Sequence, residues 1–217
     1  MTVKETEHVV LVPASGVQLE GNLVVPPSAT GVVLFAHGSG SSRHSVRNQF
    51  VARRLQSNGL ATLLIDLLTP QEERVDEVTR HVRFDIQLLA DRLNAGIDWL
   101  AGRAETSALR VGLFGASTGG GAALVAAARD PERVGAVVSR GGRPDLAAEA
   151  LPDVRAPTLL IVGGHDVPVI AMNERAMRAM RAEVRLDIVP GASHLFEEPG
   201  TLESVAELAS DWFARYL

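Results

Sequence analysis

Cysteine is absent from the 217 residues of the chain. Its absence excludes disulfide bridges, thiolate metal sites and a cysteine nucleophile. Aromatic residues make up only 4% of the chain, which predicts an aliphatic core. No run approaches the roughly 18 consecutive apolar residues needed to cross a bilayer, and residues 1–8 lack the apolar segment of a signal peptide. These absences predict a cytoplasmic protein that does not bind membranes.

The chain also has no excess of basic residues. The formal net charge is −5, which disfavours nucleic acids and anionic membrane surfaces as partners. Hydrophobic residues account for 46% of the chain and charged residues for 22%, as in typical globular proteins. No repeat, low-complexity tract or linker interrupts the sequence, so we predict a single domain over residues 1–217.

The pattern of apolar residues predicts the fold class. Two alternating segments, 8–13 and 17–26, predict an N-terminal antiparallel hairpin with a turn at 14–16. Further strands are expected at 31–36, 61–67, 110–114, 134–139, 157–162 and 184–189, and helices at 45–57, 84–100, 119–128, 173–181 and 201–216. This alternation is typical of an α/β fold with a doubly wound, mainly parallel sheet.

Two connections bear on access to any site at the edge of this sheet. Fewer than twenty residues separate the strand that ends at 139 from the one that begins at 157. That length is too short for a cap domain. The segment 69–81 is predicted to be a charged connection, and residues 71–83 are the better candidate for a lid.

The segment Gly115-Ala-Ser117-Thr-Gly119 carries the clearest chemical signal. It follows a predicted strand and precedes a predicted helix, which is the context of a nucleophile elbow. The tight turn needs glycine neighbours without Cβ atoms, lifts the serine hydroxyl above the sheet and leaves the next backbone N–H available. Gly120 and Gly121 extend the close approach of helix and strand. We therefore predict that Ser117 is a nucleophile.

A serine hydroxyl is a weak nucleophile, so it needs a base and an acid that orients the base. Asp166 and His194 follow later strands, in the order Ser, Asp, His that is typical of such elbows. The carboxyl ends of parallel strands share one edge of the sheet. The sequence leaves open that Asp166 only caps a helix, that His194 is a structural loop residue, or that His165 is the base.

Backbone donors for an oxyanion are expected on two loops. The N–H groups of Thr118 and Ser39 are the candidates, whereas His37 is expected to be structural. Arg43 and Arg140 lie near strand ends. Each is either a contact for a substrate carboxylate or a surface or structural arginine.

With these motifs the chain resembles the α/β-hydrolases, specifically the dienelactone-hydrolase-like group. The resemblance covers roughly residues 17–217 and is carried by His37-Gly38, the elbow at 115–120, the segment 163–166 and the segment 191–194. It implies the fold and acyl-transfer chemistry. Dienelactone hydrolase proper uses cysteine as its nucleophile, and serine-bearing relatives are mostly carboxylesterases. The resemblance therefore implies a serine esterase that acts on small esters, needs no cofactor or metal, and is a monomer or homodimer.

Other functions remain open at this point. A thioesterase, a perhydrolase or a small peptidase would use the same triad, and an inactive hydrolase fold could serve as a binding protein. A dinucleotide-binding oxidoreductase also has a glycine-rich turn, but it would place that turn in its first strand–helix unit. A P-loop is excluded because no lysine follows the glycines.

Overall fold

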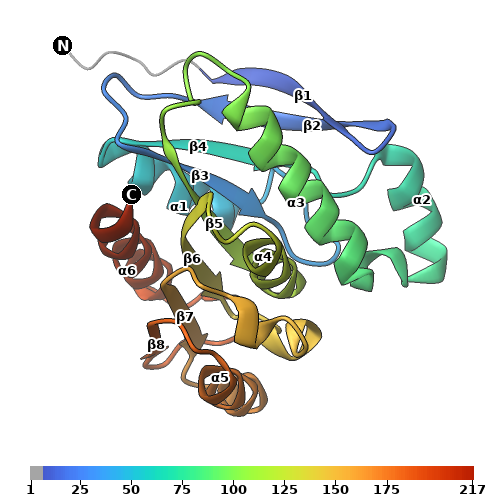
Figure 1. Cartoon of the computed structure of the whole chain (residues 1–217). Coiled ribbons are helices and arrows are strands. Elements are labelled where there is room, and N and C mark those ends of the chain that lie inside the picture. Colours follow the sequence, from blue (N-terminus) through green and yellow to red (C-terminus); the bar gives the residue numbers. More distant parts are fainter. Residues whose placement is uncertain (1–6) are drawn as a thin grey trace.

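The structure is a computed structural model that describes residues 7–217. Eight strands form one sheet in the order β1-β2-β4-β3-β5-β6-β7-β8 (Figure 1). The strands are β1 (His8–Ala14), β2 (Val17–Val24), β3 (Gly31–Ala36), β4 (Leu60–Ile65), β5 (Arg110–Ala116), β6 (Val134–Arg140), β7 (Thr158–Gly163) and β8 (Val184–Val189). β2 pairs antiparallel with β1 and with β4, and the strands from β4 to β8 are parallel. The predicted hairpin and doubly wound sheet are confirmed.

Helices cover both faces of the sheet (Figure 1). They are α1 (Val46–Ser57), α2 (Pro70–Thr79), α3 (Ile86–Ala101), α4 (Thr118–Arg129), α5 (Val167–Ala179) and α6 (Thr201–Tyr216). Three short 3-10 helices are η1 (Val82–Phe84), η2 (Pro144–Ala147) and η3 (Leu151–Asp153). The apolar faces of α3, α4 and α5 belong to one core cluster, and those of α1 and α6 belong to the other. Among the described residues, no helix is long and apolar enough to cross a membrane.

The central strands are buried on both sides, which explains their continuous apolar sequences. In β3, Val32 and Leu34 pack with the α3 and α4 layer, whereas Val33 and Phe35 pack with the α1 and α6 layer. Successive side chains of a strand point to opposite faces, so both layers are anchored by the same short segment. Parallel packing then brings the carboxyl ends of β3, β5, β6, β7 and β8 to one edge of the sheet.

Two helices differ from the sequence prediction. Residues 70–79, predicted as a charged connection, form α2, because Thr69 and Glu72 make a capping box and Pro70 occupies the first turn. The helix predicted at 173–181 begins at Val167, since Pro168 is compatible with a first helical turn. Between β6 and β7 the chain forms only η2 and η3, in agreement with the prediction that this connection is too short for a cap.

Candidate active site

Ser117 lies at the turn from β5 into α4, as the elbow motif predicts. Its backbone has φ 51° and ψ −119°, a left-handed conformation that costs energy for a residue with a Cβ atom. Hydrogen bonds hold the turn: the Ser117 N–H donates to the Arg140 carbonyl over 3.1 Å, and its carbonyl accepts from the Arg143 N–H over 3.1 Å. The serine side chain is therefore presented on a backbone fixed from both sides.

The glycines of the elbow are required by close backbone contacts. A Cβ atom on Gly119 would lie 2.3 Å from the Ala36 carbonyl oxygen and 2.6 Å from that of His37. A Cβ atom on Gly115 would lie 2.4 Å from the carbonyl oxygen of Gly119. Real Cβ atoms do not approach backbone this closely, so only glycine allows α4 to begin directly against β3 and β5.

Asp166 and His194 come together at the same edge of the sheet. Nδ1 of His194 lies 2.6 Å from Oδ2 of Asp166, a short distance that fits a charge-assisted hydrogen bond. Asp166 occupies the N-cap position of α5, yet its side chain caps no helical N–H. The reading of Asp166 as a helix cap is therefore not supported, because its carboxylate bonds to the imidazole instead.

The loop after β8 brings His194 towards the elbow. A Cβ atom on Gly141 would lie 3.4 Å from Cε1 of His194, and the residue before it, Arg140, accepts the Ser117 N–H. No hydrogen bond joins His194 to Ser117 in the part of the chain that the structure describes. Catalytic hydrogen bonds are often long before substrate binds, so this separation does not exclude a base–nucleophile pair.

His165, the rival base, is exposed, and the carboxylate of its neighbour Asp166 bonds to His194 rather than to it. The backbone N–H of His165 donates to the Ala192 carbonyl over 2.9 Å, which joins the loop after β7 to the loop after β8. The Ser193 N–H donates to Oε2 of Glu198 over 3.0 Å. These contacts fix the loop after β8, which carries His194, and favour His194 as the base.

The loop after β3 lies directly against the elbow. A Cβ atom on Gly38 would lie 3.2 Å from the Cβ of Ser117, and the hydroxyls of Ser39 and Thr118 are 3.1 Å apart. The structure therefore brings together both residues predicted to donate backbone N–H groups. Thr118 is the first residue of α4, where helix N–H groups have no acceptor within the helix.

The side chain of His37 links this loop to Leu67. Its Nδ1 lies 2.9 Å from the Gly38 carbonyl oxygen, and its Nε2 accepts the Leu67 N–H over 2.9 Å. Burial disfavours the imidazolium and lowers the pKa of His37 from its usual value. The ring is thus a neutral structural group with both nitrogens engaged, which agrees with the structural role expected from the sequence.

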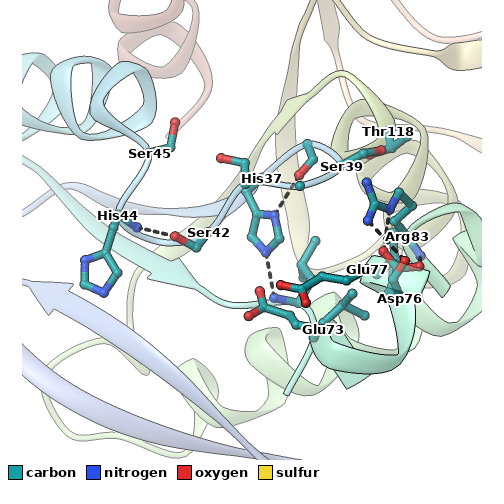
Figure 2. Close-up of a pocket in the computed structure, with 16 residues that line it drawn as sticks. His37, Ser39, Ser42, His44, Ser45, Glu73, Asp76, Glu77, Arg83 and Thr118 are labelled. Atoms are coloured by element: carbon teal, nitrogen blue, oxygen red, sulfur yellow. Dashed lines mark hydrogen bonds and ion pairs between the residues drawn. The ribbon is translucent and has the colours of Figure 1, made fainter. Parts of the chain in front are cut away.

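A cavity of about 450 Å³ opens beside Ser39 and Thr118 (Figure 2). The loop 37–45 forms one wall, and Glu73, Asp76 and Glu77 of α2 form the opposite wall. The candidate triad is not part of its lining, but Thr118 is, so the cavity begins one residue from Ser117. Its size lies within the range of small-molecule sites.

Ion pairs hold α2 in this position. The buried Arg92 of α3 donates from Nη1 to Oε2 of Glu72 over 2.7 Å and to the Leu67 carbonyl. At the other end, Arg83 pairs with Asp76. The hydrogen bond from Arg92 lowers the pKa of Glu72 to about 2. From the sequence, residues 71–83 were predicted only as a candidate lid; the capping signature of Thr69 and Glu72 was the available sign of a helix here.

The two arginines proposed from the sequence differ in their surroundings. Nε of Arg43 donates to Asn22, and its terminal nitrogens donate to Glu20 and Asp66. Since its guanidinium nitrogens are already engaged, Arg43 holds the β3 loop to the hairpin, and nothing supports its contact with substrate. Arg140 ends β6 and is only 7% exposed, and within residues 7–217 its Nε and Nη1 have no hydrogen-bond partner.

No group of three or more acidic or histidine side chains within residues 7–217 has the arrangement of a metal site. The fold and the elbow define the chain as an α/β-hydrolase. More specifically, it belongs to the dienelactone hydrolase family, whose model matches residues 19–217. Family and fold together support a hydrolase.

The solved structures that resemble the chain agree with this classification. A dienelactone hydrolase from Anabaena variabilis is 65% identical, with a TM-score of 0.97 over 99% of both chains. Est1E from Butyrivibrio proteoclasticus has a TM-score of 0.80 over 95% of this chain and 98% of its own, at 15% identity. The second likeness concerns the fold alone.

Curated relatives add a different name. Two proteins of Mycobacterium tuberculosis, each called a putative phosphoribosyl transferase, are 58% identical over 208 residues. The match covers 96% of this chain but 46% of each relative. The chain therefore spans about half the length of these relatives, and their name describes proteins of about twice the matched length.

Proposed function

We propose that the chain is a serine hydrolase that cleaves small carboxylic esters through Ser117, His194 and Asp166. The observation that carries this proposal is the hydrogen-bonded pair of His194 and Asp166 at the sheet edge where Ser117 occupies its strained turn. Membership of the dienelactone hydrolase family supports it. The putative phosphoribosyl transferase name is not carried over, because the matched segment coincides with the hydrolase family model.

The reaction has two acyl-transfer steps. Nε2 of His194 takes the proton of the Ser117 hydroxyl as its oxygen attacks the ester carbonyl, and Asp166 holds Nδ1–H and stabilises the imidazolium. The N–H groups of Ser39 and Thr118 bind the oxyanion. The carbonyl–alkoxy bond then breaks, and the alcohol leaves with the proton from His194. Water hydrolyses the acyl-enzyme through the same groups and releases the acid.

The cavity beside Thr118 indicates which esters fit. Its volume of about 450 Å³ favours short groups over long alkyl chains, and its lining combines serines and carboxylates with Leu67, Leu68 and Leu89. In a series of 4-nitrophenyl esters from acetate to dodecanoate, we expect kcat/KM to be highest at two to four carbons. A maximum at eight carbons or more would contradict this assignment of the cavity.

A fluorophosphonate probe followed by peptide mapping tests the function without a guess at the substrate. We expect an adduct on Ser117, no adduct in Ser117→Ala, and labelling slowed by about 10³-fold or more in His194→Ala. Ser41→Ala is a matched control because Ser41 lines the cavity but is not one of the three proposed catalytic residues. A folded protein that takes no label on Ser117 would overturn the proposal.

A further inference from the structure

β8 is the outermost strand of the sheet, and one of its sides has no strand partner. It pairs in parallel with β7, and within residues 7–217 no strand lies on its other side, the open side of β8. α5 and α6 pack against it, one on each face of the sheet (Figure 1). An unpaired strand presents a row of N–H and C=O groups that another strand can bind.

The N–H and C=O groups on the open side belong to Val184, Leu186 and Ile188. On the β7 side, the carbonyl of Glu183 accepts the Thr158 N–H over 2.9 Å. Successive residues of a strand direct these groups to opposite sides. The odd-numbered residues of β8 therefore bond to β7, and the three even-numbered residues face the open side.

Side chains along this part of β8 alternate between apolar and charged. Val184, Leu186 and Ile188 are apolar, and Ile188 is 45% exposed. Arg185 and Asp187 have opposite charges and pair within the chain, with Nη2 and Oδ2 2.9 Å apart. The side chain of Arg185 is still 58% exposed, so its guanidinium is open to a second carboxylate. In the reverse direction the segment has the same apolar positions, with the two charges exchanged.

A second copy of the chain matches this pattern when its β8 runs antiparallel to the first. A two-fold axis at Leu186 places Leu186 opposite itself. Val184 then lies opposite Ile188 of the second copy, and Arg185 lies opposite Asp187. The even-numbered residues form the hydrogen-bonded pairs of an antiparallel ladder, and the charged residues form the closer non-hydrogen-bonded pairs. Backbone and side chains are therefore satisfied in the same register.

Other two-fold registers fail on charge or on the backbone. An axis at Arg185 or at Asp187 places like charges opposite each other, which destabilises a strand pair. An axis at Val184 or at Ile188 pairs the strand with residues outside it. An axis between two residues places an outward-facing residue opposite one that already bonds to β7. The register about Leu186 is the one that pairs β8 with β8 and joins opposite charges.

β1, the outer strand at the other end of the sheet, has no such self-complementarity. Pro13 lacks an N–H, which weakens an outer strand as a template. Residues 9–13 carry no charge, although Val9 and Leu11 are exposed. A register chosen by charge is therefore available to β8 and not to β1.

We propose that two copies of the chain associate through their β8 strands, antiparallel about Leu186, and form one continuous sheet. The proposal goes beyond the proposed hydrolase function and does not depend on it. The strands of the second copy run in the opposite direction, so the two Ser117 turns lie at opposite edges of the continuous sheet. α5 lies beside α5 of the second copy on one face, and α6 beside α6 on the other, which adds to the area that the strand pair buries.

Reversal of single charges tests the register. In Arg185→Asp and in Asp187→Arg, each strand carries two like charges, which face like charges in the second copy. In sedimentation equilibrium at about 100 µM, where a micromolar Kd keeps a dimer populated, we expect the wild-type chain to have the mass of two chains. We expect the Kd for self-association to rise by about tenfold or more in each variant.

A mixture of the two variants separates pairing across the interface from pairing within one chain. Arg185→Asp and Asp187→Arg carry opposite charges on β8, so they complement each other in the same register. We expect the mixture to form a heterodimer with a Kd within about threefold of the wild-type value. Arg103→Asp is the matched control, because Arg103 pairs with Glu105 at the same spacing just after α3; it should keep the wild-type Kd.

Three results would overturn the proposal. One is a wild-type chain that sediments as a monomer at about 100 µM. Another is a dimer that neither single substitution weakens, because its interface would lie elsewhere. The third is loss of the dimer in both variants without recovery in their mixture, since charge pairing about Leu186 would not explain the loss. None of these measurements involves Ser117, so they are independent of the labelling that tests the hydrolase.

Discussion

The proposed triad depends on the orientation of the Asp166 carboxylate. Asp166 is the N-cap residue of α5, but its carboxylate bonds to His194 and does not cap the helix. Asp166→Asn keeps the size of the side chain but presents the wrong hydrogen-bonding group, so the imidazole turns to the unproductive tautomer. We expect kcat for a short ester to fall by roughly 10⁴ with little change in KM. Steady-state kinetics on 4-nitrophenyl acetate measure this.

Glu198, a second carboxylate in the segment that follows β8, provides the control. Oε2 of Glu198 accepts the Ser193 N–H, and the amide oxygen of Glu198→Gln can accept the same bond. We expect less than a tenfold loss in that variant. An equal loss in both variants would mean that the loop, not the Asp166–His194 pair, determines the rate.

Gly119 is the residue of the elbow that has no room for a side chain. Its Cβ position lies 2.3 Å from the carbonyl oxygen of Ala36 and 2.6 Å from that of His37, and this backbone cannot shift without moving the loop after β3. We expect Gly119→Ala to lower the free energy of unfolding by about 3 kcal/mol, the upper end of the cost of overpacking, and to abolish labelling of Ser117. Urea unfolding and probe labelling measure the two effects.

Gly102→Ala is the matched control, since Gly102 also adjoins a helix, has φ −84°, and would place its Cβ 3.6 Å from its nearest neighbour. It should change stability by less than about 1 kcal/mol. Equal destabilisation by both substitutions would mean that the close contact at Gly119 is relieved elsewhere.

At the scale of elements, α2 is the helix whose position is fixed by charge rather than by apolar burial. Val75 and Val78 on it are exposed, whereas the Glu72–Arg92 pair ties its start to α3. Arg92→Met leaves Glu72 without its buried partner. We expect a loss of about 3 kcal/mol in the free energy of unfolding and a raised KM for short esters, because the cavity loses its α2 wall. Denaturant unfolding and ester kinetics measure these.

Arg103→Met is the matched control, because Arg103 pairs with Glu105 on the surface, where an ion pair contributes about 1 kcal/mol or less. The role assigned to Arg92 would be wrong if Arg92→Met raised KM no more than Arg103→Met does.

The elements that sequence reasoning predicted best are those with the strongest local signals. The glycines of the elbow fit only a tight turn, and the continuous apolar runs of β3 and β5 fit only buried strands. The sheet and the position of Ser117 could therefore be predicted from them. α2 was missed because its charged, partly exposed sequence has little apolar periodicity. The pairing of Arg43 with Glu20 and Asp66 and the isolation of Arg140 depend on residues far apart in the chain, which local patterns do not reveal.

At the scale of the whole molecule, stability depends on pH through groups whose pKa the fold displaces. Burial lowers the pKa of His37 below 6.5, so the unfolded chain binds its proton at higher pH than the folded one. The contribution of His37 to the free energy of unfolding therefore decreases as pH falls through about 6.5. The pKa of Glu72 is lowered by Arg92 to about 2, so its contribution is complete above about 4.5 and is lost between there and 2.

The contribution of His37 can be separated from the rest by substitution. In urea unfolding at a series of pH values from 8 to 5, we expect the free energy of unfolding of the wild-type chain to decrease below pH 6.5. His37→Gln removes the titrating group and should flatten this decrease, whatever its effect on stability at pH 8. His81→Gln changes an exposed histidine and should keep the wild-type slope. Equal slopes in all three proteins would show that the buried imidazole of His37 does not couple folding to pH.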